Sequence, residues 1–94
     1  MSKPRVFDPS RRHRLSSSER RRRLPPEKIL AEIGLGPGDT FVDIGCGTGF
    51  FTLPAAMRVG PSGKAIGLDI SPEMIADLVV SASQKKLANV RTWP

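Results

Sequence analysis

The hydrophobic pattern divides the chain near residue 25. Residues 1–24 carry only four clear apolar anchors, and three consecutive serines interrupt any helical or strand period. Pro25 and Pro26 mark the change, because proline suits a first helical turn, where its missing N–H is not needed. We therefore predict an N-terminal arm over residues 1–24, loose or ordered only against another surface, and a folded domain over residues 25–94.

Apolar residues recur at alternating helical and strand spacing through the predicted domain. Ser71 and Pro72 form a typical helix start, and glycine–proline tracts separate the other elements. The predicted elements are a helix around Ile29 and Leu30, strands at 40–44 and 64–68, helices over 50–58 and from 72, and a third strand from about 89. This β-α-β-α-β order after a first helix predicts an α/β fold with a Rossmann-like parallel sheet.

Smaller expectations follow from the same pattern. Lys85 and Lys86 should lie in the last turn of the helix that begins at 72, where positive charge complements the helix dipole. Met57 and Met74 are interpreted as core fillers. Neither expectation assigns a chemical function.

Charge distinguishes the arm from the domain. The 94 residues carry 15 lysines and arginines against 9 acidic residues, a formal net charge of +6, and ten of those basic residues lie within residues 1–28. The run from Arg20 to Arg23 is interpreted as a solvated helix face, with contact to phosphate in nucleic acid, an anionic substrate or a membrane surface as the alternative. The sequence has no tyrosine, and no aromatic residues interleave with the basic ones, which argues against a dedicated RNA-binding module.

Cysteine content and hydropathy constrain the class of protein further. The single cysteine, Cys46, excludes an internal disulfide framework and favours a reducing, cytoplasmic location. No apolar run approaches the roughly 20 residues of a membrane span, and no apolar stretch follows the basic start as in a secretory signal. We predict a cytoplasmic protein with no membrane span.

The candidate chemistry lies in a glycine-rich turn between a predicted strand and a predicted helix. Gly45, Gly47 and Gly49 allow a sharp turn and the close approach of a ligand, because no Cβ stands in the way. Asp69 ends the next strand, where Rossmann-like folds place an acid that binds the ribose hydroxyls of a nucleotide. The alternative is a structural turn that binds nothing, with Asp69 as a capping or surface acid.

The spacing of the turn bears on which nucleotide it would take. Dinucleotide sites use G-x-G-x-x-G/A, whereas here the spacing is G-x-G-x-G and Phe50 fills the sixth position. Asp43, just before the turn, would repel a pyrophosphate and favour a cation. A ligand with a ribose and a positive charge suits both acids, and S-adenosylmethionine has a sulfonium and an ammonium group. A dinucleotide-dependent oxidoreductase is the disfavoured alternative.

The chain resembles class I S-adenosylmethionine-dependent methyltransferases in two motifs, D-I-G-C-G-T-G-F over residues 43–50 and G-L-D-I-S-P-E-M over residues 67–74. The tracts F-D-P and S-S-E-R-R-R-R-L-P-P-E-K-I-L also resemble the lead-in of small bacterial and archaeal members. The resemblance implies a methyltransferase that acts on a small molecule with S-adenosylmethionine as cofactor.

The same resemblance implies a role for each matched residue. The three glycines would form the turn under the methionine part of the cofactor, and Cys46 and Thr48 would line that turn. Asp43 would act near the cofactor's amino group, in part through water. Asp69 would bind the ribose hydroxyls, and Ile70 would pack on the adenine.

The resemblance also bears on the chemistry of the reaction. The family transfers the methyl group in line from sulfonium to acceptor, so the protein supplies positioning and desolvation rather than covalent catalysis. We therefore assign no catalytic residue and no metal ligand. The single histidine, His13, falls in the arm.

The chain supplies fewer strands than the resemblance requires. The family fold has seven strands, of which the predicted domain carries the first three, so the outer edge of residues 41–44 and one sheet face are expected to be open. We expect a fragment of a longer methyltransferase, the cofactor-binding half alone, poorly folded and with little activity by itself. The alternative is a complete short protein that self-associates through its open sheet edge.

Overall fold

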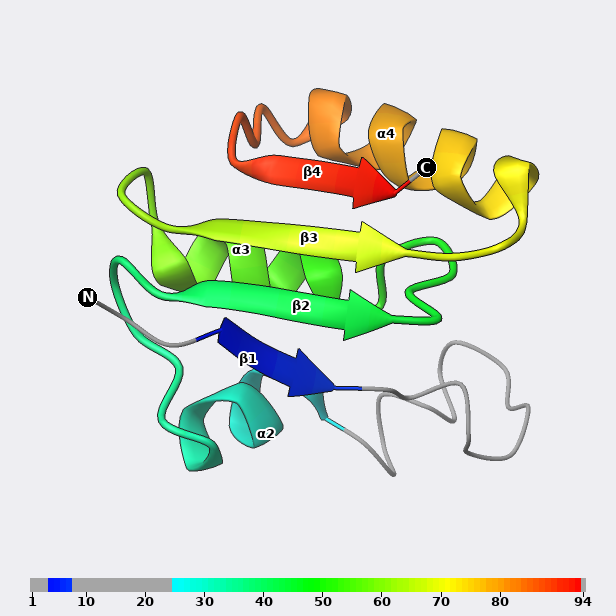
Figure 1. Ribbon diagram of the computed structural model, residues 1–94. Coiled ribbons are helices and arrows are strands. Elements are labelled where there is room, and N and C mark those ends of the chain that lie inside the picture. The colour runs from blue at the N-terminus through cyan, green and yellow to red at the C-terminus, as the bar shows by residue number, and fades with distance from the viewer. Residues whose placement is uncertain (1–3, 8–24, 94) are drawn as a thin grey trace.

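The computed structural model describes residues 4–7 and 25–93, and four parallel strands in these residues form one sheet (Figure 1). The strands lie in chain order, and the helices follow the alternation expected from the sequence. The strands are β1 (Pro4–Phe7), β2 (Thr40–Ile44), β3 (Lys64–Leu68) and β4 (Val90–Trp93). The helices are α2 (Pro26–Glu32), α3 (Thr52–Val59) and α4 (Pro72–Gln84). The predicted Rossmann-like order, a helix followed by β-α-β-α-β, is confirmed.

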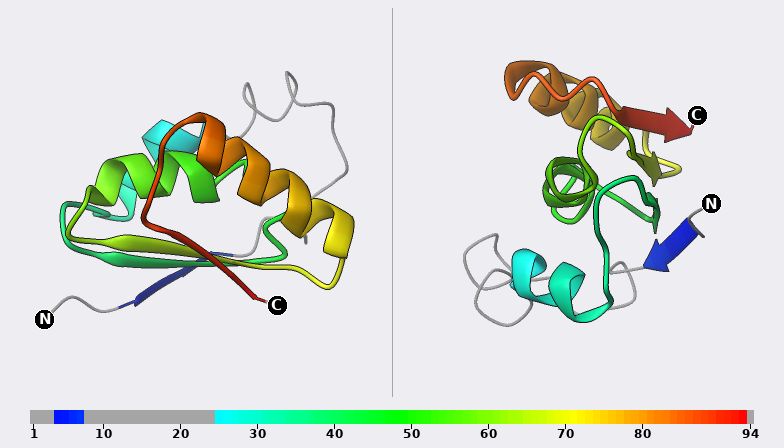
Figure 2. Two further views of the ribbon diagram at one scale, coloured as in Figure 1. Left: turned by 90° about the horizontal axis from the view of Figure 1, so that it is seen from above. Right: turned by 90° about the vertical axis from the view of Figure 1, so that its left-hand side faces the viewer.

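The helices of the described residues cover one face of the sheet (Figure 2, left). The strand alternation explains this, because Phe41 and Asp43 of β2 are buried toward the helices while Val42 is half-buried and Ile44 is 43% exposed on the other face. Ile66 of β3 shares that second face and is also only half-buried. The second face carries apolar residues of a two-sided sheet, as the sequence predicts.

The core lies between α3 and the middle of the sheet. Phe41 and Phe51 are its largest members and are wholly inaccessible to solvent. Burial of one such side chain stabilises a fold by about 1.5–3 kcal/mol. The core residues are Leu30, Leu35, Phe41, Phe51, Ala55, Ala56, Val59 and Ala65.

The outer edge of β2 is occupied, which corrects the expectation of an open edge. β1 pairs with β2 in parallel, with Pro4 opposite Thr40 and Phe7 opposite Asp43. Backbone N–H and C=O groups at a strand edge favour pairing with any extended segment within reach, and residues 4–7 supply one. Residues 4–7 are therefore ordered against the edge of β2, in keeping with the second alternative given for the arm. Residues 8–24, including the arginine run, lie outside the described residues, so the division near residue 25 stays a prediction.

Two helix ends and two methionines differ from the sequence predictions. α3 begins at Thr52 rather than Phe50, because the turn extends through Phe51. α4 begins after Ser71 as predicted, but it ends at Gln84, so Lys85 and Lys86 lie beyond its last turn. Met57 and Met74 are 65% and 42% exposed and are not core residues, because they fall on the outer sides of their helices.

Candidate functional site

The glycine turn joins the carboxyl end of β2 to α3. Gly45, Gly47 and Gly49 have φ of 71°, 57° and 103°, in the region that favours glycine. A Cβ at Gly49 would lie 2.6 Å from Leu78 Cδ1, so this position also needs the absence of a side chain. A Cβ at Gly47 would meet nothing within 4 Å, so the turn is open at this residue. The predicted turn is present, and its middle glycine has open space beside it.

Backbone hydrogen bonds fasten the turn to the end of β3. The amides of Gly45 and Cys46 both donate to Leu68 O, at 2.6 and 2.9 Å. This attachment places Asp69, the residue after β3, beside the turn. Gly47 and Asp69, which are 22 residues apart in the sequence, therefore meet at one edge of the sheet.

Asp69 accepts one backbone hydrogen bond on each carboxylate oxygen. Gly47 N donates to Oδ2 at 2.9 Å, and Ser71 N donates to Oδ1 at 2.8 Å. Each carboxylate oxygen has two acceptor sites, so the half-buried group can accept further hydrogen bonds from a ligand. The geometry makes Asp69 both a clamp on the glycine turn and an acceptor at its rim.

Asp43 lies under the turn and is fully buried. Thr52, also fully buried, donates from Oγ1 to Asp43 Oδ2 at 2.6 Å. This distance is at the short end of the range for O–H···O hydrogen bonds. Because Asp43 is inaccessible in this structure, its charge would act on a bound group through water or across the turn. The sequence does not single out Thr52, since the only signal is one hydroxyl within an apolar run.

Cys46 is a packing residue of the turn. Its side chain is 3% exposed, and a Cβ at Gly67 would lie 2.8 Å from its Sγ, so the thiol fills the space above a glycine of β3. Burial, followed by the negative charges of Asp43 and Asp69, raises the pKa of the Cys46 thiol to about 12. The thiol is therefore protonated at neutral pH and is not a nucleophile. The smaller contributions of Asp43 and Asp69 to this shift reflect two acidic groups close to the turn.

Thr48 and Ile70, the remaining predicted site residues, lie on the surface. Thr48 is exposed at the tip of the turn, and Ile70 is fully exposed directly after Asp69. Ile70 is a large apolar side chain next to an acid, and its full exposure allows it to pack against the flat ring of a ligand. The packing of Ile70 on adenine stays a prediction.

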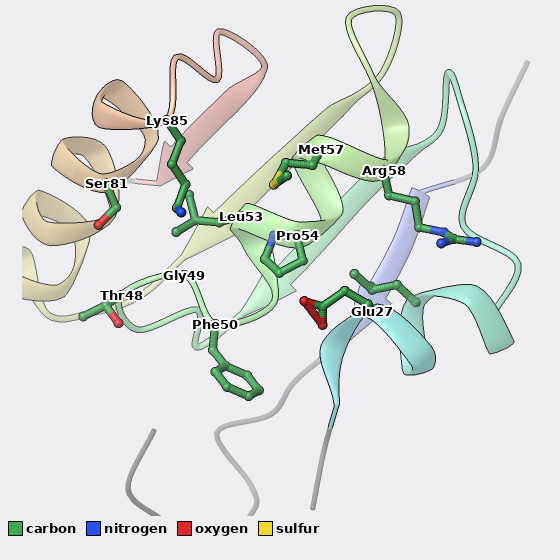
Figure 3. A pocket seen from close by; sticks show the side chains of 11 residues that line it. Glu27, Thr48, Gly49, Phe50, Leu53, Pro54, Met57, Arg58, Ser81 and Lys85 are labelled. Atoms are coloured by element: carbon green, nitrogen blue, oxygen red, sulfur yellow. The ribbon is translucent and has the colours of Figure 1, made fainter. Parts of the chain in front are cut away.

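A groove of about 680 Å³ adjoins the turn and runs over α3 between α2 and α4 (Figure 3). It shares Thr48 and Gly49 with the turn, but Asp43 and Asp69 are not among its lining residues. The groove is therefore distinct from the position between the two acids. Its lining residues are Glu27, Leu30, Thr48, Gly49, Phe50, Leu53, Pro54, Met57, Arg58, Ser81 and Lys85.

Residues 4–7 and 25–93 contain neither a membrane-spanning helix nor a cluster of metal-binding side chains. None of the helices there has the length and hydropathy needed to cross a membrane. Within the same residues, no three histidine, cysteine or acidic side chains come together in a way that could hold a metal ion.

Known methyltransferases are similar to this chain in sequence. The model of a family described as "Methyltransferase domain" matches residues 35–92. Nocamycin O-methyltransferase from Saccharothrix syringae is 41% identical over 63 residues, which cover 67% of this chain and 22% of the relative. Arsenite methyltransferase from Halobacterium salinarum is 38% identical over 71 residues, with 64% and 18% covered. The chain thus spans about a fifth of the length of these relatives.

Solved structures are similar over most of the described fold. A SAM-dependent methyltransferase from Aquifex aeolicus matches with a TM-score of 0.73 and 30% identity, over 85% of this chain and 47% of that one. Coclaurine N-methyltransferase, at 16% identity and a TM-score of 0.71 over 87% and 24% of the two chains, shares the fold. With the matched residues including both the glycine turn and Asp69, the chain belongs to the S-adenosylmethionine-dependent methyltransferase family.

Proposed function

We propose that this chain binds S-adenosylmethionine at the turn of residues 45–49 and serves methyl transfer. The observation that carries the proposal is the 2.9 Å hydrogen bond from Gly47 N to Asp69 Oδ2, which joins the two motifs at the carboxyl ends of β2 and β3. Ligands of open parallel α/β sheets bind at this edge. The turn would lie under the methionine part of the cofactor, with Cys46 and Thr48 lining it.

The chemistry of the acids supports this cofactor over a dinucleotide. S-adenosylmethionine carries a sulfonium and an ammonium group, and both are favoured by the negative charges of Asp43 and Asp69 at the turn. A pyrophosphate would be repelled by the same charges. Asp69 would accept the ribose hydroxyls, and the exposed side chain of Ile70 would pack on the adenine. The similar enzyme from Plasmodium falciparum, a putative protein-L-isoaspartate O-methyltransferase, is in complex with S-adenosyl-L-homocysteine.

The bound cofactor would supply an electrophilic methyl group for direct transfer to a nucleophilic acceptor. The residues of this chain would orient the cofactor and exclude water from one side of it, which is the main contribution a protein makes to such a displacement. The protonated thiol of Cys46 takes no covalent part.

A small molecule is the acceptor that we propose. The similar nocamycin O-methyltransferase and arsenite methyltransferase are named after small molecules. We assign no residue of this chain to the acceptor, and we expect the 94-residue chain alone to transfer little. We also propose a cytoplasmic location, in keeping with the single free cysteine.

Titration of the ¹⁵N-labelled chain with S-adenosylhomocysteine tests the proposed cofactor. NMR detects weak binding, which is what we expect from part of a cofactor site. Shifts should concentrate on the amides of residues 45–49 and 69–71, and NAD at the same concentration should leave them in place. Absence of any shift in a folded chain, or equal shifts with NAD, would contradict the proposed cofactor.

A further inference from the structure

A buried hydroxyl–carboxylate pair lies beneath the glycine turn. Thr52 Oγ1 donates to Asp43 Oδ2 at 2.6 Å, and both side chains have no exposed surface. Asp43 belongs to the end of β2 and Thr52 is the first residue of α3, so the bond spans the turn from its first strand to its following helix. Any displacement of the carboxylate would therefore be coupled to the backbone that carries the three glycines.

A buried carboxylate needs such a partner to keep its charge. Transfer of an ionised carboxylate out of water is unfavourable unless hydrogen bonds replace those of the solvent. In the same low-dielectric surroundings its charge acts over a longer distance than it would in water. The effect reaches the turn, because the charge of Asp43 contributes to the raised pKa of the Cys46 thiol. A cation bound over the turn would be stabilised by the same charge.

We propose that Thr52 is a positioning residue of the cofactor site, which holds the carboxylate of Asp43 under the turn and so favours a ligand that carries an ammonium group. The inference rests on the proposed function, since it needs the cofactor at the turn. Thr52 itself touches no part of the ligand in this scheme. It acts only through the carboxylate that it holds.

Three adenosine ligands distinguish this role from a purely structural one. S-adenosylhomocysteine carries both the ammonium and the carboxylate of the amino-acid end. Decarboxylated S-adenosylmethionine keeps the ammonium and lacks the carboxylate, and 5′-methylthioadenosine lacks the whole amino-acid end. A structural defect in the turn would weaken all three ligands, whereas loss of the Asp43 charge would weaken only the two with an ammonium group.

The test uses the full chain with Thr52→Val, which keeps the shape of the side chain and removes its donor. Dissociation constants from NMR titration should rise about tenfold for S-adenosylhomocysteine and decarboxylated S-adenosylmethionine and stay unchanged for 5′-methylthioadenosine. Thr52→Ser, which restores the hydroxyl, should recover the wild-type values. Thr40→Val is the matched control, because it makes the same chemical change at the opposite end of β2.

Asp43→Asn is the second variant, in case Thr52→Val does not fold. It removes the charge, while its amide oxygen can still accept the bond from Thr52, and it should lose the same preference for ammonium-bearing ligands. Equal losses for all three ligands, or no loss for any, in a folded Thr52→Val or Asp43→Asn chain would overturn the role of Thr52 and leave the proposed function standing. If the wild-type chain binds none of the ligands, the proposed function fails and this inference fails with it.

Discussion

Replacing Asp69 should separate its two roles, the clamp on the glycine turn and the acceptor for a ribose. The carboxylate accepts from Gly47 N at 2.9 Å and from Ser71 N at 2.8 Å. A hydrogen bond to a charged group contributes about 1.5–3 kcal/mol, and the half-buried position favours the lower end of this range. Asp69→Ala removes both bonds and should lower the free energy of unfolding by about 3 kcal/mol. Asp69→Asn keeps one amide oxygen and should lose about half as much.

The same variants should weaken every ligand that carries the adenosine ribose. Because Asp69 would contact the ribose rather than the amino-acid end, Asp69→Asn should raise the dissociation constants of S-adenosylhomocysteine and 5′-methylthioadenosine by the same factor, roughly tenfold for one lost charge-assisted bond. This pattern differs from the one expected for Thr52→Val, which should leave the affinity for 5′-methylthioadenosine unchanged. NMR titration gives the dissociation constants, and urea denaturation gives the free energy of unfolding.

Asp77→Asn is the matched control, because it changes the net charge equally on an exposed position of α4. It should leave both ligand affinity and stability near wild type. If Asp69→Asn binds both ligands as the wild type does, the assignment of the ribose contact is wrong, even if its stability falls. If stability is also unchanged, the bond between Gly47 and Asp69 does not hold the turn in solution.

Three further predictions concern stability. Lys86 has φ of 57° at the end of α4, where the amide of Leu87 bonds back to Ala82 O, so Lys86→Gly should raise the free energy of unfolding by about 1 kcal/mol while Lys86→Ala should not. Asn89 Nδ2 donates to Ala56 O at 2.9 Å and to Gly60 O at 2.8 Å at the end of α3, so Asn89→Ala should lower that free energy by about 1–3 kcal/mol in urea denaturation. The pKa of the Cys46 thiol rises from 9.0 to about 12 on folding. Above pH 9 the unfolded chain therefore binds fewer protons than the folded chain. The free energy of unfolding should fall there by up to about 1.4 kcal/mol per pH unit. Cys46→Ala should remove this part of the slope between pH 8 and 10, and equal slopes for the two proteins would contradict the buried thiol.

Much of the fold could be predicted because its signals are local. The strand at 40–44 and the helix after Ser71 are marked by apolar runs, by a capping serine whose side chain accepts from Met74 N, and by glycines in turns. The meeting of Asp69 with the glycine turn could also be expected, because the carboxyl ends of neighbouring parallel strands lie at the same edge of a sheet. The Lys86 conformation could not, because lysine is not the residue that a left-handed position favours.

Two further features that the sequence did not reveal both depend on a partner. Residues 4–7 have no strand pattern of their own, and only the unpaired edge of β2, with Thr40 opposite Pro4, makes them a strand. Thr52 is one hydroxyl in an apolar helix start, and only the buried carboxylate of Asp43 at 2.6 Å gives it a chemical role. In each case the residue type gives no signal by itself, and the polar group of β2 that it meets determines its role. Since both partners belong to β2, the strand that leads into the glycine turn organises the edge of the sheet and the charge beneath the site.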